Sequence, residues 1–95
     1  MENLASTKVY LFGGKLDQEV PYEAVEFAKK VWNQYTAYTH SNYSIMAGHT
    51  MVTDFYGYRC TSVRNPWISN CYFDLAYVAL DYLIGPLNTS YLFYN

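Results

Sequence analysis

Apolar and polar positions follow two different periods along the chain, and these periods predict strands and helices. Residues 8–12 (Lys-Val-Tyr-Leu-Phe) form an apolar, β-prone run that stops at two glycines. Such a run is typical of a buried strand followed by a turn. Residues 1–6 precede it as a short, loose lead-in. We therefore expect the ordered part of the domain to begin with a strand.

Two segments have the spacing of amphipathic helices. In residues 21–38 apolar side chains recur at intervals of three and four. Pro21 suits the first turn of this helix, because backbone N–H groups there have no partner within the helix and proline has no N–H. In residues 70–84 a second apolar stripe follows Ser69 and Asn70, either of which can cap a helix. The Gly-Pro pair after this stripe predicts its end.

The remaining segments have the composition of strands. Residues 43–63 are rich in β-branched and aromatic side chains, and we expect two antiparallel strands joined near Gly48, with a final strand over residues 89–94. The order β-α-β-β-α-β predicts an α+β fold of the ferredoxin-like kind, in which two helices cover one face of an antiparallel sheet. A rearranged α+β fold with the same elements is the alternative. All of residues 1–95 would form one domain.

The composition narrows the class of protein. The chain is 52% hydrophobic and 15% charged, so it can bury enough apolar surface to fold without a partner. Its net charge of −2 disfavours both polyanion binding and polyanion mimicry. No secretory leader and no apolar stretch of membrane-spanning length are recognisable. We therefore expect a cytoplasmic protein that meets no membrane.

The cysteines and histidines suggest no metal site. Two cysteines, Cys60 and Cys71, are too few for the disulfide framework of small secreted domains. A single disulfide between them is an alternative, but we expect both cysteines to be reduced. With His40 and His49 they give four candidate zinc ligands, but structural zinc sites place ligands in closely spaced pairs, which this chain lacks. We expect no metal and no other cofactor.

The sequence also contains no recognisable catalytic motif. Cys60 and His49 would form a nucleophile pair only if the intervening strands set them face to face, and no Gly-x-Ser-x-Gly turn exposes a serine. Asp17 and Glu19 lie near the start of the first predicted helix, where solvated acids suit the helix dipole. Asp54 interrupts an apolar run and is expected on a solvent-facing side. The sequence thus predicts a protein that is not an enzyme.

Aromatic residues are the least ordinary feature of the chain, which holds twelve Tyr, five Phe and two Trp. A domain this small cannot bury all of these rings. Tyr, Trp and Arg dominate the hot spots of binding surfaces, and tyrosine offers a large contact area with few rotamers to fix. We therefore predict a partner-binding patch made of Tyr56, Tyr58, Arg59, Arg64 and Trp67.

Two segments resemble the motifs of RNA-recognition domains. Residues 9–13 (Val-Tyr-Leu-Phe-Gly) resemble the shorter ribonucleoprotein motif, and residues 56–63 resemble the longer one. The resemblance implies that Tyr10 and Tyr58 would stack on bases, and the expected fold agrees with it. However, a tyrosine stands where the longer motif begins with Lys or Arg, and Cys60 replaces an aromatic residue.

The leading hypothesis is a small non-enzymatic protein-binding module that acts by covering a surface of a larger protein. Phages and mobile elements encode many such inhibitors of host defence, and a phage protein would act in the host cytoplasm. A single-stranded nucleic-acid binder using the open sheet face is the alternative. A small enzyme or ligand-binding domain of unfamiliar type is the second alternative. The aromatic patch could also be self-complementary in a homo-oligomer.

Overall fold

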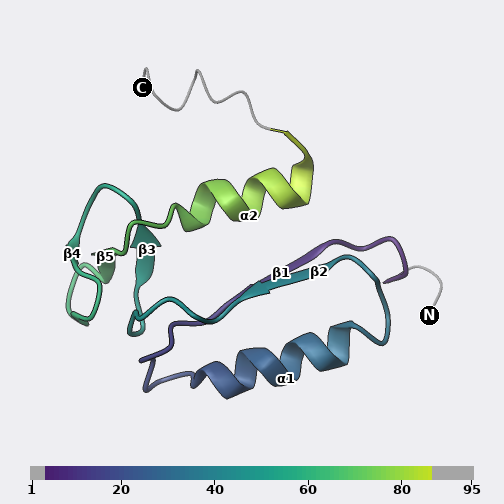
Figure 1. Cartoon of the computed structure of the whole chain (residues 1–95), viewed down its shortest axis with the longest axis horizontal. Helices are drawn as coiled ribbons and strands as arrows, with labels where there is room; N and C mark the ends of the chain where they lie inside the picture. The colour runs from purple at the N-terminus through teal and green to yellow at the C-terminus, as the bar shows by residue number, and fades with distance from the viewer. Residues whose placement is uncertain (1–3, 87–95) are drawn as a thin grey trace.

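A computed structural model describes residues 4–86, and Figure 1 shows their layered arrangement. Two parallel strands, β1 (Val9–Phe12) and β2 (Thr39–Asn42), lie between two helices. Helix α1 (Tyr22–Trp32) covers one face of this pair, and helix α2 (Leu75–Ile84) covers the other. The central part of the molecule is therefore a three-layer α/β/α arrangement.

A second sheet lies beyond the carboxyl ends of β1 and β2 (Figure 1). Its strands are β3 (Met51–Thr53), β4 (Tyr58–Arg59) and β5 (Ile68–Asn70), in the order β3-β5-β4. All of its pairings are parallel. The strands are very short, so loops make up most of this end of the molecule.

The prediction of an antiparallel ferredoxin-like sheet with two helices on one face is wrong. Both sheets are parallel, and the helices lie on opposite faces of the β1–β2 pair. The physical reason is the connection between β1 and β2, which is a helix: a helical crossover returns the chain to the end where the first strand began, so the next strand runs parallel. The predicted strand over residues 89–94 lies outside the described residues.

The predicted helices are real but shorter than expected. Helix α1 ends at Trp32 because Thr36 is tied to the start of β1: its hydroxyl donates to the carbonyl of Thr7 (2.7 Å) and accepts from the N–H of Tyr38 (3.0 Å). Ser69 and Asn70, the expected caps of the second helix, lie in β5 instead.

Helix α2 begins after Asp74, whose side chain accepts a hydrogen bond from the N–H of Tyr77 at 3.0 Å. This contact satisfies one of the free amides of the first turn. The helix ends at Ile84, before Gly85, and this end confirms the prediction. Gly85 has a φ of 90°, a conformation that favours glycine.

The fully buried core is small. Val25, Ala47 and Val52 are the buried hydrophobic side chains of the described residues, with Thr36 and Ser69 as buried polar ones. The molecule measures 42 × 36 × 18 Å, so it is a thin slab. Across residues 4–86 no helix combines the length and the hydrophobicity needed to cross a membrane.

The buried hydroxyl of Thr36 supplies a first prediction. Thr36→Val keeps the shape of the side chain but leaves the Thr7 carbonyl and the Tyr38 N–H without their partner, so the free energy of unfolding should fall by about 2 kcal/mol. Urea unfolding followed by circular dichroism measures this change. Thr61→Val, at an exposed threonine, is the control and should change stability by less than about 0.5 kcal/mol. Equal stability of the two variants would contradict the assignment.

Candidate active site

A carboxylate and an imidazole meet at the carboxyl ends of β1 and β2. Asp17 lies in the connection from β1 to α1, and His49 lies between β2 and β3. The Nδ1 atom of His49 is 2.9 Å from Oδ2 of Asp17, although the residues are 32 positions apart in the sequence. They meet because parallel strands end at the same edge of a sheet, where the loops that follow them gather.

The Asp17 carboxylate is fixed on both of its oxygens. Oδ1 accepts hydrogen bonds from the backbone N–H groups of Glu19 and Val20, both at 2.8 Å, while Oδ2 faces His49. The Asp17 side chain is 8% exposed and that of His49 is 56% exposed. The carboxylate is thus held inside, and the imidazole projects outward from it.

Opposing influences act on the pKa of Asp17. Burial raises this pKa, but the hydrogen bonds from the Val20 N–H, from His49 and from the Glu19 N–H together outweigh burial. The net result is a pKa below the ordinary value of an aspartate. Asp17 is therefore ionised near neutral pH and can orient the His49 ring through Nδ1.

Backbone contacts hold two loops against each other: the aspartate loop (residues 13–21) and the histidine loop (residues 43–50). The N–H of Lys15 donates to the carbonyl of Ile45 at 2.7 Å, and the N–H of Leu16 donates to the carbonyl of Ala47 at 3.0 Å. Gly14 makes this approach feasible, because a Cβ atom there would lie 2.2 Å from the Ala47 oxygen. Gly14, the second glycine of the predicted turn, therefore lies in contact with the histidine loop.

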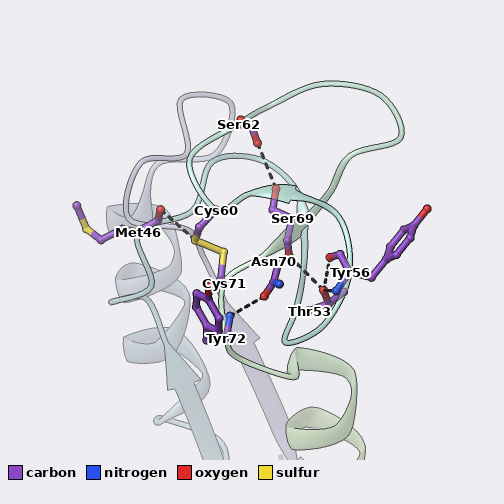
Figure 2. Close-up of a disulfide and its surroundings, with 9 residues drawn as sticks. All are labelled: Met46, Thr53, Tyr56, Cys60, Ser62, Ser69, Asn70, Cys71 and Tyr72. Atoms are coloured by element: carbon purple, nitrogen blue, oxygen red, sulfur yellow. Dashed lines mark hydrogen bonds between the residues drawn. A yellow bond between two sulfur atoms is a disulfide. The ribbon is translucent and has the colours of Figure 1, made fainter.

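Residues 60–71 form a segment that packs against the histidine loop. A Cβ atom on Gly48 would lie 2.2 Å from Cγ2 of Val63, and the Met51 N–H donates to the Trp67 carbonyl at 2.8 Å. Sγ of Cys60 lies 3.3 Å from the Met46 carbonyl oxygen (Figure 2). The histidine loop is thus packed between the aspartate loop and this segment.

Cys60 and Cys71 form a disulfide, with Cα atoms 4.7 Å apart (Figure 2), so the expectation of reduced cysteines is wrong. The reason is the register of the second sheet, in which Arg59 on β4 pairs with Asn70 on β5. Cys60 and Cys71 directly follow these two residues and therefore lie close enough to form a disulfide. The bridge also removes Cys60 as a nucleophile for His49. Within residues 4–86 no group of three or more His, Cys, Asp or Glu side chains could hold a metal ion.

A cavity of about 690 Å³ opens beside the Asp17–His49 pair. Much of its wall is apolar, with side chains contributed by Phe12, Met51, Val63 and Trp67. With Nδ1 of His49 directed to Asp17, the second ring nitrogen, Nε2, is left to take a proton from another group. None of the described residues that line the cavity is a serine or a cysteine.

The predicted partner-binding residues are exposed, and three of them line two separate hollows. Arg64 lies over the Tyr58 ring, 4.4 Å from its centroid. Tyr56 and Tyr58 line a separate hollow of about 480 Å³. Trp67, in contrast, lines the cavity next to His49. Arg59 is exposed on β4. Whether these side chains bind a partner stays a prediction.

The two tyrosines that the RNA-recognition resemblance paired lie in different sheets. Tyr10 is on β1, and its ring packs near that of Tyr82 with centroids 6.5 Å apart. Burial there raises the pKa of the Tyr10 hydroxyl. Tyr58 is on β4. The described sheets therefore provide no common strand face for both rings.

Sequence reasoning read Asp17 as a solvated acid and missed its pairing with His49. The available signal was the order strand, helix, strand over residues 8–42, because such a unit brings the loops after its strands to one edge. Asp54 is exposed, as expected.

Comparison with known proteins gives the site a context. The chain is similar to poly(3-hydroxybutyrate) depolymerases. It is 41% identical over 88 residues to the poly(3-hydroxybutyrate) depolymerase of Delftia acidovorans, covering 90% of this chain and 18% of that protein. It is 32% identical over 91 residues to the polyhydroxybutyrate depolymerase of Talaromyces funiculosus, covering 90% of this chain and 27% of that protein. No family model matches.

The fold comparison agrees with the sequence comparison. A solved PHB depolymerase, a serine-to-alanine variant complexed with an R3HB trimer, matches with a TM-score of 0.85 and 31% identity. The match covers 93% of this chain and 29% of the solved one. The chain therefore spans less than a third of the length of the depolymerases that it matches.

These similarities correct the functional predictions made from the sequence. The hypotheses of a non-enzymatic inhibitor of host defence and of a single-stranded nucleic-acid binder are wrong, because nine-tenths of the chain matches proteins that are named as depolymerases. The prediction that the protein is not an enzyme is contradicted by the same similarities. The ferredoxin-like fold is likewise replaced by the fold of the solved depolymerase. The surplus of aromatic residues is therefore weak evidence for a protein-binding module.

Because the Asp17 pKa is lowered by folding, its charge stabilises the folded chain above the unfolded-state pKa of about 3.9, and this contribution is lost as pH falls through the folded-state pKa. Asp17→Asn keeps the acceptor for the Glu19 and Val20 N–H groups but removes the charge. The stability difference from wild type should be largest near about pH 7 and shrink below about pH 4. Chemical unfolding across this range measures it, and a difference independent of pH would contradict the assignment.

The close contact at Gly14 gives a further prediction. Gly14→Ala should push the aspartate and histidine loops apart, because the added methyl group meets the backbone oxygen of Ala47, and overpacking of this kind costs about 1–3 kcal/mol. Thermal unfolding and the NMR shifts of the His49 ring report stability and pairing. Gln18→Ala, at an exposed side chain of the same loop, is the matched control. Wild-type stability and unchanged His49 signals in the glycine variant would show that the loops are not in contact.

Proposed function

We propose that this chain supplies the aspartate and the histidine of a serine-esterase site that cleaves the ester bonds of poly(3-hydroxybutyrate) or its oligomers. The observation that carries the proposal is the contact between Asp17 and His49 beside an apolar cavity, in a chain similar to depolymerases. The proposal concerns a site to which this chain contributes, because it spans only part of those relatives.

The geometry fits the two roles. In a Ser-His-Asp triad the carboxylate accepts from the Nδ1–H of the histidine, sets its tautomer and stabilises the imidazolium that forms. Asp17 meets these needs, since it is ionised, is shielded from solvent and has one oxygen free of backbone partners for His49. His49 is then a general base that acts through Nε2.

The reaction follows from these roles. His49 takes the proton of a serine hydroxyl as the serine oxygen attacks the ester carbonyl carbon, and it returns that proton to the alcohol oxygen that leaves. Water then attacks the acyl-serine: His49 removes a proton from the water and gives it back to the serine oxygen, which releases the carboxylic acid. The serine comes from a segment other than the described residues that line the cavity, because none of these is a serine.

The substrate class agrees with the cavity. Polyester chains of 3-hydroxybutyrate are uncharged and carry a methyl group on each unit, so apolar walls suit them. Phe12, Met51, Val63 and Trp67 provide such walls around the Asp17–His49 pair. The volume of about 690 Å³ is in the ordinary range for small-molecule sites.

The location of the protein stays a prediction. The cytoplasmic assignment rested on the lack of a recognisable leader and of a membrane-spanning stretch. The disulfide between Cys60 and Cys71 counts against it, because such bonds persist in oxidising compartments.

The test uses a chimaera in which this chain replaces the 88 matched residues of the Delftia acidovorans depolymerase. Hydrolysis of 3-hydroxybutyrate trimer is followed by the acid released. Asp17→Asn and His49→Gln should each lower kcat by at least about 10³-fold with a smaller change in KM, and the double variant should be little worse than the weaker single one, since triad members act as a unit.

The other histidine provides the matched control. His40 lies on β2 with its ring stacked on Tyr82, 3.9 Å between centroids, and it does not line the cavity. His40→Gln should therefore leave kcat within about two-fold of the unmodified chimaera, as expected for a residue outside the reacting unit. Equal activity of the His40 and His49 variants would refute the proposed role of His49.

A further inference from the structure

Charged side chains are distributed unequally around the cavity beside the Asp17–His49 pair. The residues that line it include two acids, Asp17 and Glu19, together with His49. All six lysines and arginines of the chain lie within the described residues, and none of them lines this cavity. The side chains of this chain therefore give the cavity a negative wall with no lysine or arginine to balance it.

The two acids differ in how their carboxylates are engaged. The Asp17 carboxylate is 8% exposed, and both of its oxygens have partners. Glu19 is exposed, and within residues 4–86 the single ion pair joins His49 to Asp17. No described cation therefore neutralises the Glu19 carboxylate, and its negative charge can act on a molecule in the cavity.

The backbone holds Glu19 directly beside the Asp17–His49 pair. The N–H of Glu19 donates to Oδ1 of Asp17 at 2.8 Å, and the N–H of Val20 donates to the same atom at 2.8 Å. Such a turn around an aspartate side chain fixes the residues that follow it. Glu19 cannot move away from His49 without breaking these hydrogen bonds.

The lysine of the same loop does not offset this charge. Lys15 lines a second hollow of about 570 Å³, which shares Glu19 and His49 with the cavity. Its ammonium nitrogen lies 3.8 Å from the centroid of the Tyr22 ring. Lys15 thus contacts an aromatic ring, and it does not line the cavity beside the apolar walls.

A chain of 3-hydroxybutyrate units carries its charge at one end only. Neutral ester bonds join the units, whereas the last unit ends in a free carboxylate. When the last ester bond is cleaved, the alcohol oxygen that leaves belongs to this last unit, and the carboxylate is only a few bonds away from it. His49 returns a proton to this oxygen in the proposed reaction, so the free carboxylate would lie near Glu19.

We propose that Glu19 is a specificity-determining residue, whose carboxylate disfavours cleavage of the ester bond next to the free carboxylate end of the polyester. Two negative charges repel each other more strongly beside apolar walls than in bulk water, because the effective dielectric constant is lower. A like charge discriminates against an anionic ligand and leaves a neutral one unaffected. The inference rests on the proposed function for the identity of the substrate, and it directs cleavage to ester bonds further from the charged end.

Two ligands that differ in charge test the discrimination. They are 3-hydroxybutyrate trimer and the same trimer with its terminal carboxylate replaced by a neutral carboxamide of similar shape. Binding of each to the full chain is followed by the NMR signals of the His49 ring, near neutral pH and at low ionic strength. We expect the wild-type chain to bind the amide at least about five-fold more tightly than the acid.

Variants assign this preference to Glu19. Glu19→Gln removes the charge and keeps the length of the side chain, so the preference should fall below about two-fold, and Glu19→Lys should reverse it. Glu23→Gln is the matched control, because Glu23 is an exposed acid in the first turn of α1 that lines neither hollow. It should keep the wild-type preference. Circular dichroism checks that each variant is folded.

The salt dependence gives an independent readout of the same interaction. Raising the ionic strength to about 1 M shortens the Debye length to about 3 Å, so the preference of the wild-type chain for the amide should shrink. The weak preference of Glu19→Gln should not change with salt.

The chimaera with the Delftia acidovorans depolymerase extends the test to the reaction. The ratio of kcat/KM for the amide to kcat/KM for the acid should be at least about five in the chimaera that carries the wild-type chain. Glu19→Gln should lower this ratio by raising kcat/KM for the acid. Glu23→Gln should leave the ratio as it is.

Each outcome bears on the role of Glu19. Equal binding of the two ligands by the wild-type chain, no binding of either, or a preference that Glu19→Gln leaves intact would overturn it. A loss of preference in Glu23→Gln as large as in Glu19→Gln would also overturn it.

The two assays separate this inference from the proposed function. If the binding preference depends on Glu19 but the chimaera hydrolyses neither trimer, the discrimination stands as a property of the cavity and the proposed function fails. If the chimaera hydrolyses both trimers equally well, the proposed function stands and the role of Glu19 fails.

Discussion

The parallel pairing of β1 with β2 is the constraint on which the rest of the site depends. Both strands end at the same edge of the sheet, so the loops that carry Asp17 and His49 are brought together despite their separation in sequence. Gly14 then allows the backbones of these loops to touch, and two interloop hydrogen bonds fix their distance. The orientation of one carboxylate toward one imidazole nitrogen is thus a consequence of backbone geometry.

The second sheet gives the histidine loop a rigid support. Its parallel register brings Cys60 next to Cys71, and the resulting bridge joins the ends of β4 and β5. The same segment contacts the histidine loop through Val63 and through the Trp67 carbonyl. Support from both sides fits the proposed role of His49 as a general base, because small displacements of a catalytic group are costly for a reaction.

The thinness of the molecule explains its unusual surface. A domain of this composition would ordinarily hide most of its large apolar side chains, yet many remain exposed while the buried hydrophobic core of the described residues is limited to three. Aromatic composition alone could not show whether these exposed side chains bind a partner, and the predicted patch stays a prediction.

The sequence by itself determined the local elements: the first strand, the start of α1 near Pro21 and the end of α2 before Gly85, because these depend on neighbouring residues and on the conformational limits of proline and glycine. Only the tertiary structure decided the parallel direction of the strands, the disulfide and the pairing of Asp17 with His49. The physical reason is that strand direction and register arise from contacts between distant segments, and hydrophobic periodicity within one segment contains no information about its neighbour.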